Sequence, residues 1–225
     1  MATDIDPELF DSLGADYEKA FGHDQGLREF IEKVLTLLPP CSKVLDVGCG
    51  TGNPVSSTLA SNGHKVTGID VSPSMVGLSR KAVPSGEFEV ADMTKYVPKD
   101  KMNAIFNILC LFWLSREGME EMTKKWHEWL LPGGLVCICT FGAEDLNPTK
   151  EMYDEDGMCA SGMEFLFMGH KAQLLLMTKE GWKRMLEAAG FEIVETMEDY
   201  FEPKGDTHAE YHHFIIARKV RENAS

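Results

Sequence analysis

The chain has 225 residues and a net charge of −14 at neutral pH, from 36 acidic side chains against 22 lysines and arginines. An acidic surface of this size repels polyanions, so we do not expect DNA or RNA as a partner. The length suits one α/β domain with a substantial core, and 44% hydrophobic residues are ordinary for a globular protein.

No segment indicates export or a membrane. The N-terminus is acidic and lacks the apolar core of a signal peptide. The longest nearly apolar stretch, 104–114, is too short to cross a bilayer. We therefore expect a cytoplasmic protein, either a monomer or a homodimer, with reduced cysteines. The six cysteines form no C-x-x-C pair, which argues against a metal site.

Strand-like segments alternate with helical ones along most of the chain. An amphipathic helix is expected over 24–38, before two prolines. Strands follow at Lys43–Val47, Lys65–Asp70, Phe88–Ala91, from Ala104, and at Leu135–Phe141. Helices are expected from Asn53-Pro54, from Ser72-Pro73, and over Glu117–Leu131. This alternation predicts a parallel sheet that is covered by helices on both faces.

The C-terminal part changes this pattern. A helix over Thr178–Ala189 precedes strands at Phe191–Met197 and His212–Arg218, which only a loop connects. Strands joined without a crossover helix pair antiparallel. The predicted fold class is therefore α/β, with a doubly wound, seven-stranded, mostly parallel sheet and an antiparallel last strand.

A glycine-rich turn follows the first strand, in the order Asp46-Val47-Gly48-Cys49-Gly50-Thr51-Gly52. Glycines let the backbone turn tightly and approach a ligand closely. A dinucleotide fingerprint reads G-x-G-x-x-G, but here the spacing is G-x-G-x-G and Asp46 precedes it. A carboxylate at this place disfavours a pyrophosphate and suits a ligand with an ammonium group, such as S-adenosylmethionine.

Val44–Gly52 resembles the first motif of the class I S-adenosylmethionine-dependent methyltransferases. The resemblance extends over about 40–220, except for the segment 142–177. It implies a Rossmann-like methyltransferase fold in a single domain and S-adenosylmethionine as the cofactor. Within that domain we expect an N-terminal helical lid (1–40), a cofactor-binding core (41–141), a substrate cap (142–177) and a C-terminal helix with a strand pair (178–225).

The resemblance also implies a set of cofactor residues. Asp70 ends the second strand and would accept hydrogen bonds from the ribose hydroxyls. Met75 would pack on the adenine, although a core methionine fits the pattern equally well. Asp92 would bind the adenine amino group, and Asn107 lies where the backbone of relatives meets the methionine part. The complete predicted set is Asp46, Gly48, Cys49, Gly50, Asp70, Val71, Met75, Asp92, Met93 and Asn107.

The sequence defines the residues that would bind the methyl acceptor less clearly than those for the cofactor. Phe112, Trp113 and Phe167 are predicted to line the substrate pocket, with core packing as the alternative. Trp113 stands where many relatives of this family carry His. Candidate catalytic residues are His170 in an apolar setting, Tyr17 in the lid, and His213. Since strand residues alternate, His212 and His213 should point to opposite faces.

These features predict methyl transfer to an O or N atom of a small molecule, with secondary metabolites among the acceptors considered. Asn107-Ile108-Leu109-Cys110 is not the N-P-P-Y-like motif of enzymes that methylate adenine or glutamine side chains. Three alternatives are a protein that binds the cofactor without catalysis, an enzyme that uses the cofactor for cyclisation, and a nicotinamide dehydrogenase. Fold alone does not separate the first two from a methyltransferase.

Overall fold

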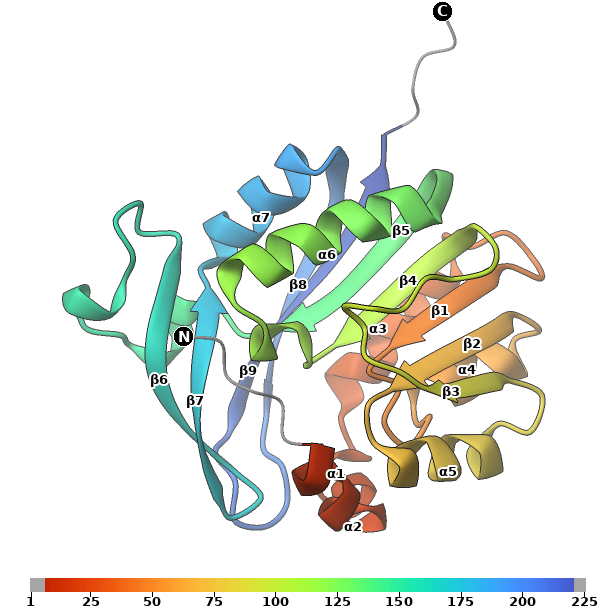
Figure 1. Cartoon of the computed structure of the whole chain (residues 1–225), viewed down its shortest axis with the longest axis horizontal. Coiled ribbons are helices and arrows are strands. Elements are labelled where there is room, and N and C mark those ends of the chain that lie inside the picture. Colours follow the sequence, from red (N-terminus) through yellow and green to blue (C-terminus); the bar gives the residue numbers. More distant parts are fainter. Residues whose placement is uncertain (1–6, 221–225) are drawn as a thin grey trace, which may run out of the picture.

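The computed structural model describes residues 7–220. Its main sheet has seven strands in the order β3-β2-β1-β4-β5-β9-β8, and a two-stranded hairpin stands beside it (Figure 1). The strands are β1 (Lys43–Val47), β2 (Lys65–Asp70), β3 (Glu87–Val90), β4 (Met102–Ile108), β5 (Leu130–Thr140), β8 (Phe191–Phe201) and β9 (Glu210–Lys219). β9 runs antiparallel to both of its neighbours, and the other strands are parallel to one another. The predicted fold class is confirmed.

Helices cover both faces of this sheet. They are α3 (Gln25–Leu35), α4 (Val55–Ser61) and α5 (Pro73–Ala82) on one face, and α6 (Arg116–Trp129) and α7 (Lys179–Ala188) on the other. Alternate residues of each strand supply the two cores. Leu45 and Ile105 pack toward α6 and α7, while Val44 and Phe106 pack toward α3.

Local sequence explains where the helices begin. The side chain of Asp24 accepts a hydrogen bond from Leu27 N (2.8 Å) and caps α3, as Ser72 caps α5 ahead of Pro73. Several expected boundaries shift, and two helix ends are examples. The helix after the glycine turn begins at Val55, with Pro54 rather than Asn53 at the cap, and α6 ends before Leu130, where β5 starts.

The segment 142–177, for which no strand or helix was predicted, contains a β-hairpin. β6 (Cys159–Phe167) pairs antiparallel with β7 (His170–Met177). Met168 (φ 48°) and Gly169 (φ 81°) form the tight turn between them. Two short 3₁₀ helices, η2 (Ala143–Leu146) and η3 (Lys150–Met152), lead into the hairpin. Together the hairpin and these turns form one wall beside the sheet (Figure 1).

Two short helices, α1 (Pro7–Leu13) and α2 (Ala15–Phe21), precede α3 and lie at one end of the sheet, near α5 (Figure 1). The Asp11 carboxylate fixes α1 there, because it accepts hydrogen bonds from the Ser72 hydroxyl and from Ser74 N. Over the described range 7–220, no helix has the length and apolar character needed to span a bilayer.

Candidate functional site

Two adjoining cavities lie where β1, β2 and β4 end, enclosed by α1, α2 and the hairpin. The first has an empty volume of about 630 Å³ and the second of about 430 Å³. Four residues line both of them: Phe10, Tyr17, Leu109 and Trp113. In an open α/β sheet, ligands bind at the carboxyl ends of the strands. The two cavities therefore form one two-compartment site at the expected edge.

The first cavity is built around the glycine turn. Gly48 has a positive φ of 77°, and a Cβ at this position would lie only 2.5 Å from the Cys110 sulfur. The Gly48 and Cys49 amides donate to Ile69 O (2.8 and 3.0 Å), which ties the turn to the end of β2. Only glycine, which has no Cβ, lets the turn lie this close to the loop after β4. Gly50, another predicted cofactor residue, also lines the cavity.

Asp70 presents its carboxylate at the same cavity. One oxygen accepts from Gly50 N (2.9 Å) and the other from Ser72 N (2.9 Å), so the group is held between the glycine turn and the start of α5. Burial raises the pKa of Asp70, while these backbone hydrogen bonds act in the opposite direction. Each oxygen retains a lone pair for a ligand hydroxyl.

Apolar side chains complete the first cavity. Val71, Met75 and Met93, three of the predicted cofactor residues, line it together with Ile69 and Ala91. Met75 is almost fully buried, so it both packs in the core and borders the cavity. The result is an apolar slot with one carboxylate and glycine backbone at its rim.

Two of the predicted cofactor residues lie beneath the glycine turn instead of at the cavity. Asp46 is buried and accepts a hydrogen bond from the Ser56 hydroxyl (2.6 Å). Burial raises the pKa of Asp46 to about 7, although that hydrogen bond lowers it. The Cys49 sulfur is also buried and lies 3.6 Å from Ser79 Oγ. Both side chains therefore support the turn, and in this arrangement neither lines a cavity.

Asp92 and Asn107 also lie outside the lining. The Asp92 carboxylate accepts a hydrogen bond from the Thr94 hydroxyl (2.7 Å) and forms an ion pair with Lys95 Nζ (2.8 Å). The Asn107 amide donates to the Cys110 sulfur (2.8 Å) and to Val47 O (3.3 Å). Asn107 thereby holds the loop after β4, whose residues do line the first cavity.

The second cavity is aromatic. Phe112, Trp113 and Phe167, the predicted substrate residues, all line it, and so does Tyr17. The remaining aromatic lining residues are Phe10, Phe21, Phe141 and Phe165, and sequence analysis did not identify Phe10, Phe21 or Phe141. Several of these rings are in mutual contact: Phe141 stacks on Phe112 (5.2 Å between centroids) and on Phe165 (5.3 Å). Stacked rings restrain one another and give the cavity defined walls.

Among the residues that the structure describes, one ionisable group besides Tyr17 lines this aromatic cavity, namely Glu210. Its Oε2 lies 2.7 Å from His212 Nε2, and the other ring nitrogen of His212 lies 3.3 Å from Asp24 Oδ2. All three side chains are buried. Burial disfavours charge on His212, but the two carboxylates outweigh it and raise the pKa of His212 to about 9. At neutral pH the imidazole is therefore a cation between two acids.

Tyr17 is held differently. Its ring stacks on Phe21, with centroids 4.8 Å apart. Burial raises the pKa of Tyr17, and the negative charges of Glu210 and Asp70 raise it further. The phenol consequently stays protonated and can donate a hydrogen bond, but it does not offer a phenolate as a base.

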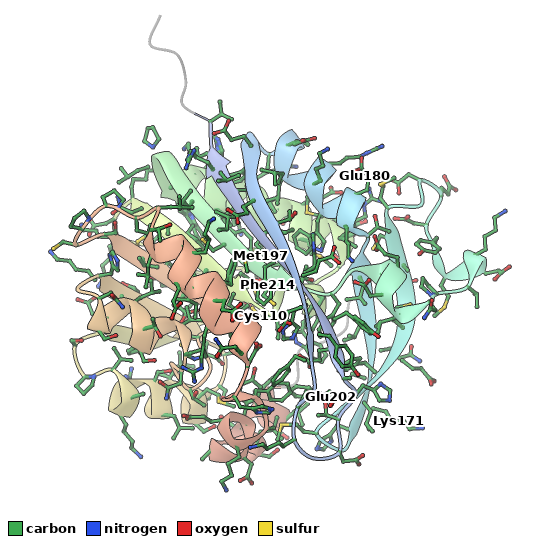
Figure 2. All side chains as sticks on the ribbon, turned by 180° about the vertical axis from the view of Figure 1, so that it is seen from behind. Cys110, Lys171, Glu180, Met197, Glu202 and Phe214 are labelled. Carbon is green, nitrogen blue, oxygen red and sulfur yellow. The ribbon has the colours of Figure 1, made fainter. Side chains whose placement is uncertain are left out.

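The two histidines predicted as catalytic lie outside both cavities. His170, expected in apolar surroundings, is exposed at the start of β7 and borders a separate open hollow. Its neighbour Lys171 is at the periphery of the molecule in Figure 2, whereas Cys110, which lines the first cavity, is near the middle. His213 is buried 4.0 Å from Glu198, on the face of β9 opposite to His212. The predicted alternation of the two neighbours is confirmed.

We expect His170→Ala to leave methyl-transfer turnover within about twofold of the wild-type rate, because surface substitutions away from a site have small effects. Initial rates with labelled cofactor would check this. A loss of tenfold or more would restore His170 as a base.

Similar proteins were found by sequence and by structure. A family model described as "Methyltransferase domain" matches residues 44–134. An uncharacterized methyltransferase of Oceanobacillus iheyensis is 30% identical over 197 residues, which cover 84% of this chain and 78% of that protein. Phosphoethanolamine N-methyltransferase 1 of Arabidopsis thaliana is 32% identical over 147 residues. That match covers 60% of this chain and 29% of the Arabidopsis protein.

A solved structure shares the fold. It is the 1,6-didemethyltoxoflavin-N1-methyltransferase of Burkholderia thailandensis, crystallised with S-adenosylhomocysteine, with a TM-score of 0.70 and 19% identity. The superposition covers 95% of this chain and 87% of the Burkholderia protein. The seven-stranded sheet is thus the Rossmann-like methyltransferase fold that the motif implied.

Proposed function

Because the chain belongs to the S-adenosylmethionine-dependent methyltransferases, we propose that it transfers a methyl group to an O or N atom of a small molecule. The observation that carries this is the pair of adjoining cavities. One is apolar with a carboxylate and glycine backbone at its rim, and the other is aromatic. The first would hold the cofactor and the second the acceptor, with the hairpin as the substrate cap.

The residues of the first cavity fit S-adenosylmethionine. Asp70 can accept hydrogen bonds from two ribose hydroxyls. Met75, Val71 and Met93 offer apolar faces for an adenine. The glycine turn reads G-x-G-x-G, which departs from the G-x-G-x-x-G spacing of a dinucleotide site. This disfavours the nicotinamide dehydrogenase alternative.

When bound, S-adenosylmethionine supplies an electrophilic methyl group on a sulfonium. The contribution of the chain is mainly to hold the acceptor in line with it, since positioning alone provides up to about 7–11 kcal/mol in the best cases. Trp113 and Leu109 border both cavities and would set the approach. Side chains of α1, α2 and the hairpin line the second cavity and would limit access of water to the acceptor.

A hydroxyl or ammonium acceptor must also lose a proton. Glu210 is the carboxylate that lines the acceptor cavity, and burial raises its pKa while the charge of His212 lowers it. A carboxylate with a raised pKa accepts a proton more readily at neutral pH. We propose Glu210 as the proton acceptor, in place of the histidines that the sequence suggested.

Filling the aromatic cavity tests this assignment. Ala172 lines it from β7, so Ala172→Phe should reduce labelled methyl transfer into a metabolite extract at least tenfold by obstruction. The affinity for S-adenosylhomocysteine, measured by calorimetry, should change by less than about threefold. Gln173→Phe adds the same ring to the next, exposed residue and serves as the control.

Three outcomes would contradict the proposal. Equal transfer by Ala172→Phe and Gln173→Phe would remove the second cavity as the acceptor site. Cofactor binding by the wild type without any labelled product would favour a non-catalytic binder. A cyclic product together with methylthioadenosine would favour the cyclisation alternative.

A further inference from the structure

We propose that the aromatic cavity is selective for a cationic amine, which Glu210 and the surrounding rings bind as an ammonium ion. This rests on the proposed function, because it assigns the substrate class of the same site. It goes beyond the proposed function in two respects: the methyl acceptor atom is a nitrogen rather than an oxygen, and anionic acceptors are excluded.

The first support is the composition of the walls. Eight of the twelve residues that line this cavity are aromatic, and the other apolar ones are Leu109, Ala172 and Leu174. Aromatic faces attract a cation within about 6 Å of the ring centre, most strongly when water is excluded. An apolar neutral ligand would be bound equally well by aliphatic walls, so the rings alone do not decide the charge.

The second support is the single carboxylate among these rings. Glu210 is 2% exposed, and over residues 7–220 its one hydrogen bond is the contact of Oε2 with His212. Its other oxygen, Oε1, could therefore accept a hydrogen bond from a ligand. A buried acid in an apolar cavity is costly unless a partner supplies donors or positive charge. An ammonium group supplies both.

The third support is the charge balance around Glu210. Asp24 and Glu210 face one cation, His212, so these three buried side chains carry one negative charge in excess when both acids are ionised. The protonated phenol of Tyr17 lines the same cavity, and its pKa is raised in part by the charge of Glu210. A monovalent cation in the cavity would bring the local charge to zero, whereas an anion would add to the imbalance.

The fourth support is the absence of positive side chains from the walls. Within the described part of the chain, neither cavity is lined by Lys, Arg or His. Phosphate and carboxylate groups are normally bound by such donors, above all by arginine. The acceptor of this chain therefore differs in charge from phosphoethanolamine, the phosphate-bearing compound for which the Arabidopsis relative is named.

Three probes of similar shape test the inference: 2-phenylethylamine, 2-phenylethanol and phenylacetate. Their affinities are measured by calorimetry with the full chain, saturated with S-adenosylhomocysteine. We expect the amine to bind at least tenfold more tightly than the alcohol, and the carboxylate to bind most weakly. In Glu210→Gln, which keeps the shape and a hydrogen-bonding oxygen, the advantage of the amine should fall below threefold.

Glu164→Gln is the matched control. It removes a carboxylate from the exposed face of the hairpin, so the preference for the amine should persist. If Glu210→Gln does not fold, Phe165→Leu removes a ring from the cavity and should weaken the amine more than the alcohol.

Equal binding of amine and alcohol by the wild type would overturn the inference, as would an undiminished preference in Glu210→Gln. Tight binding of phenylacetate would overturn it as well. Labelled methyl transfer to neutral hydroxyl acceptors alone would refute the inference but leave the proposed function intact. Failure of all three probes to bind would contradict the inference and the acceptor site together.

Discussion

Replacing Asp70 by Ala should weaken binding of S-adenosylhomocysteine at least about tenfold, or roughly 1.4 kcal/mol. The carboxylate lines the first cavity and can accept from ligand hydroxyls, and hydrogen bonds to a charged group contribute about 1.5–3 kcal/mol each. It also accepts hydrogen bonds from the backbone amides of Gly50 and Ser72. The substitution therefore removes a ligand contact and loosens the glycine turn at once.

Asp70→Asn separates these two effects. It retains one acceptor oxygen and the shape of the side chain, so the loss of affinity should be intermediate. Calorimetry gives the dissociation constants, and thermal unfolding without ligand reports damage to the turn. Unchanged affinity in the Ala variant would rule out Asp70 as a cofactor residue.

Replacing His212 by Leu should lower the free energy of unfolding by about 3–5 kcal/mol, because it leaves Asp24 and Glu210 as buried acids without a cation. Urea denaturation at pH 7 measures the loss. His213→Leu is the matched control on the opposite face of β9. Burial lowers the pKa of His213 below its usual value, so the ring is neutral and its loss should cost much less. Equal losses would show that His212 contributes packing and not charge.

The stability of the wild type should also depend on pH through His212. Its folded-state pKa of about 9 exceeds its unfolded value of 6.5. The stabilisation is therefore complete below pH 6.5 and is lost as the pH rises through 9. The fall is on the order of 3 kcal/mol, from about 1.4 kcal/mol per pKa unit. His212→Leu should lack this fall between pH 6.5 and 9.5, and His213→Leu should retain it.

The order of the sheet elements could be predicted because each depends on local patterning. β1 and β2 have the predicted bounds, and Ser72 caps the helix that was expected to begin there. Part of the lining of the first cavity was predicted for the same reason. Gly48, Gly50 and Asp70 all directly end or follow a strand, so the strand positions fix their place at one edge.

The hairpin was missed although its strands alternate. Met163, Phe165 and Phe167 face the protein interior, with Glu164 exposed between them. Two things hid the pattern: the turn is Met168-Gly169 rather than Asn-Gly, and η2 and η3 precede it without any period. Its role as a wall of the second cavity depends on docking against α1 and α2.

By itself the sequence determined the fold class, the family and the edge of the sheet at which the two cavities lie, because these follow from strand–turn–helix segments that are contiguous in the chain. Only the tertiary structure decided which charges meet. Asp24, which caps α3, and His212, which lies in β9, are 188 residues apart. Their contact depends on how distant elements pack. The same packing places Glu210 beside aromatic side chains from α1, α2 and the hairpin. No local pattern encodes that packing, and it is the reason why Glu210, and not His170, is at the proposed acceptor site.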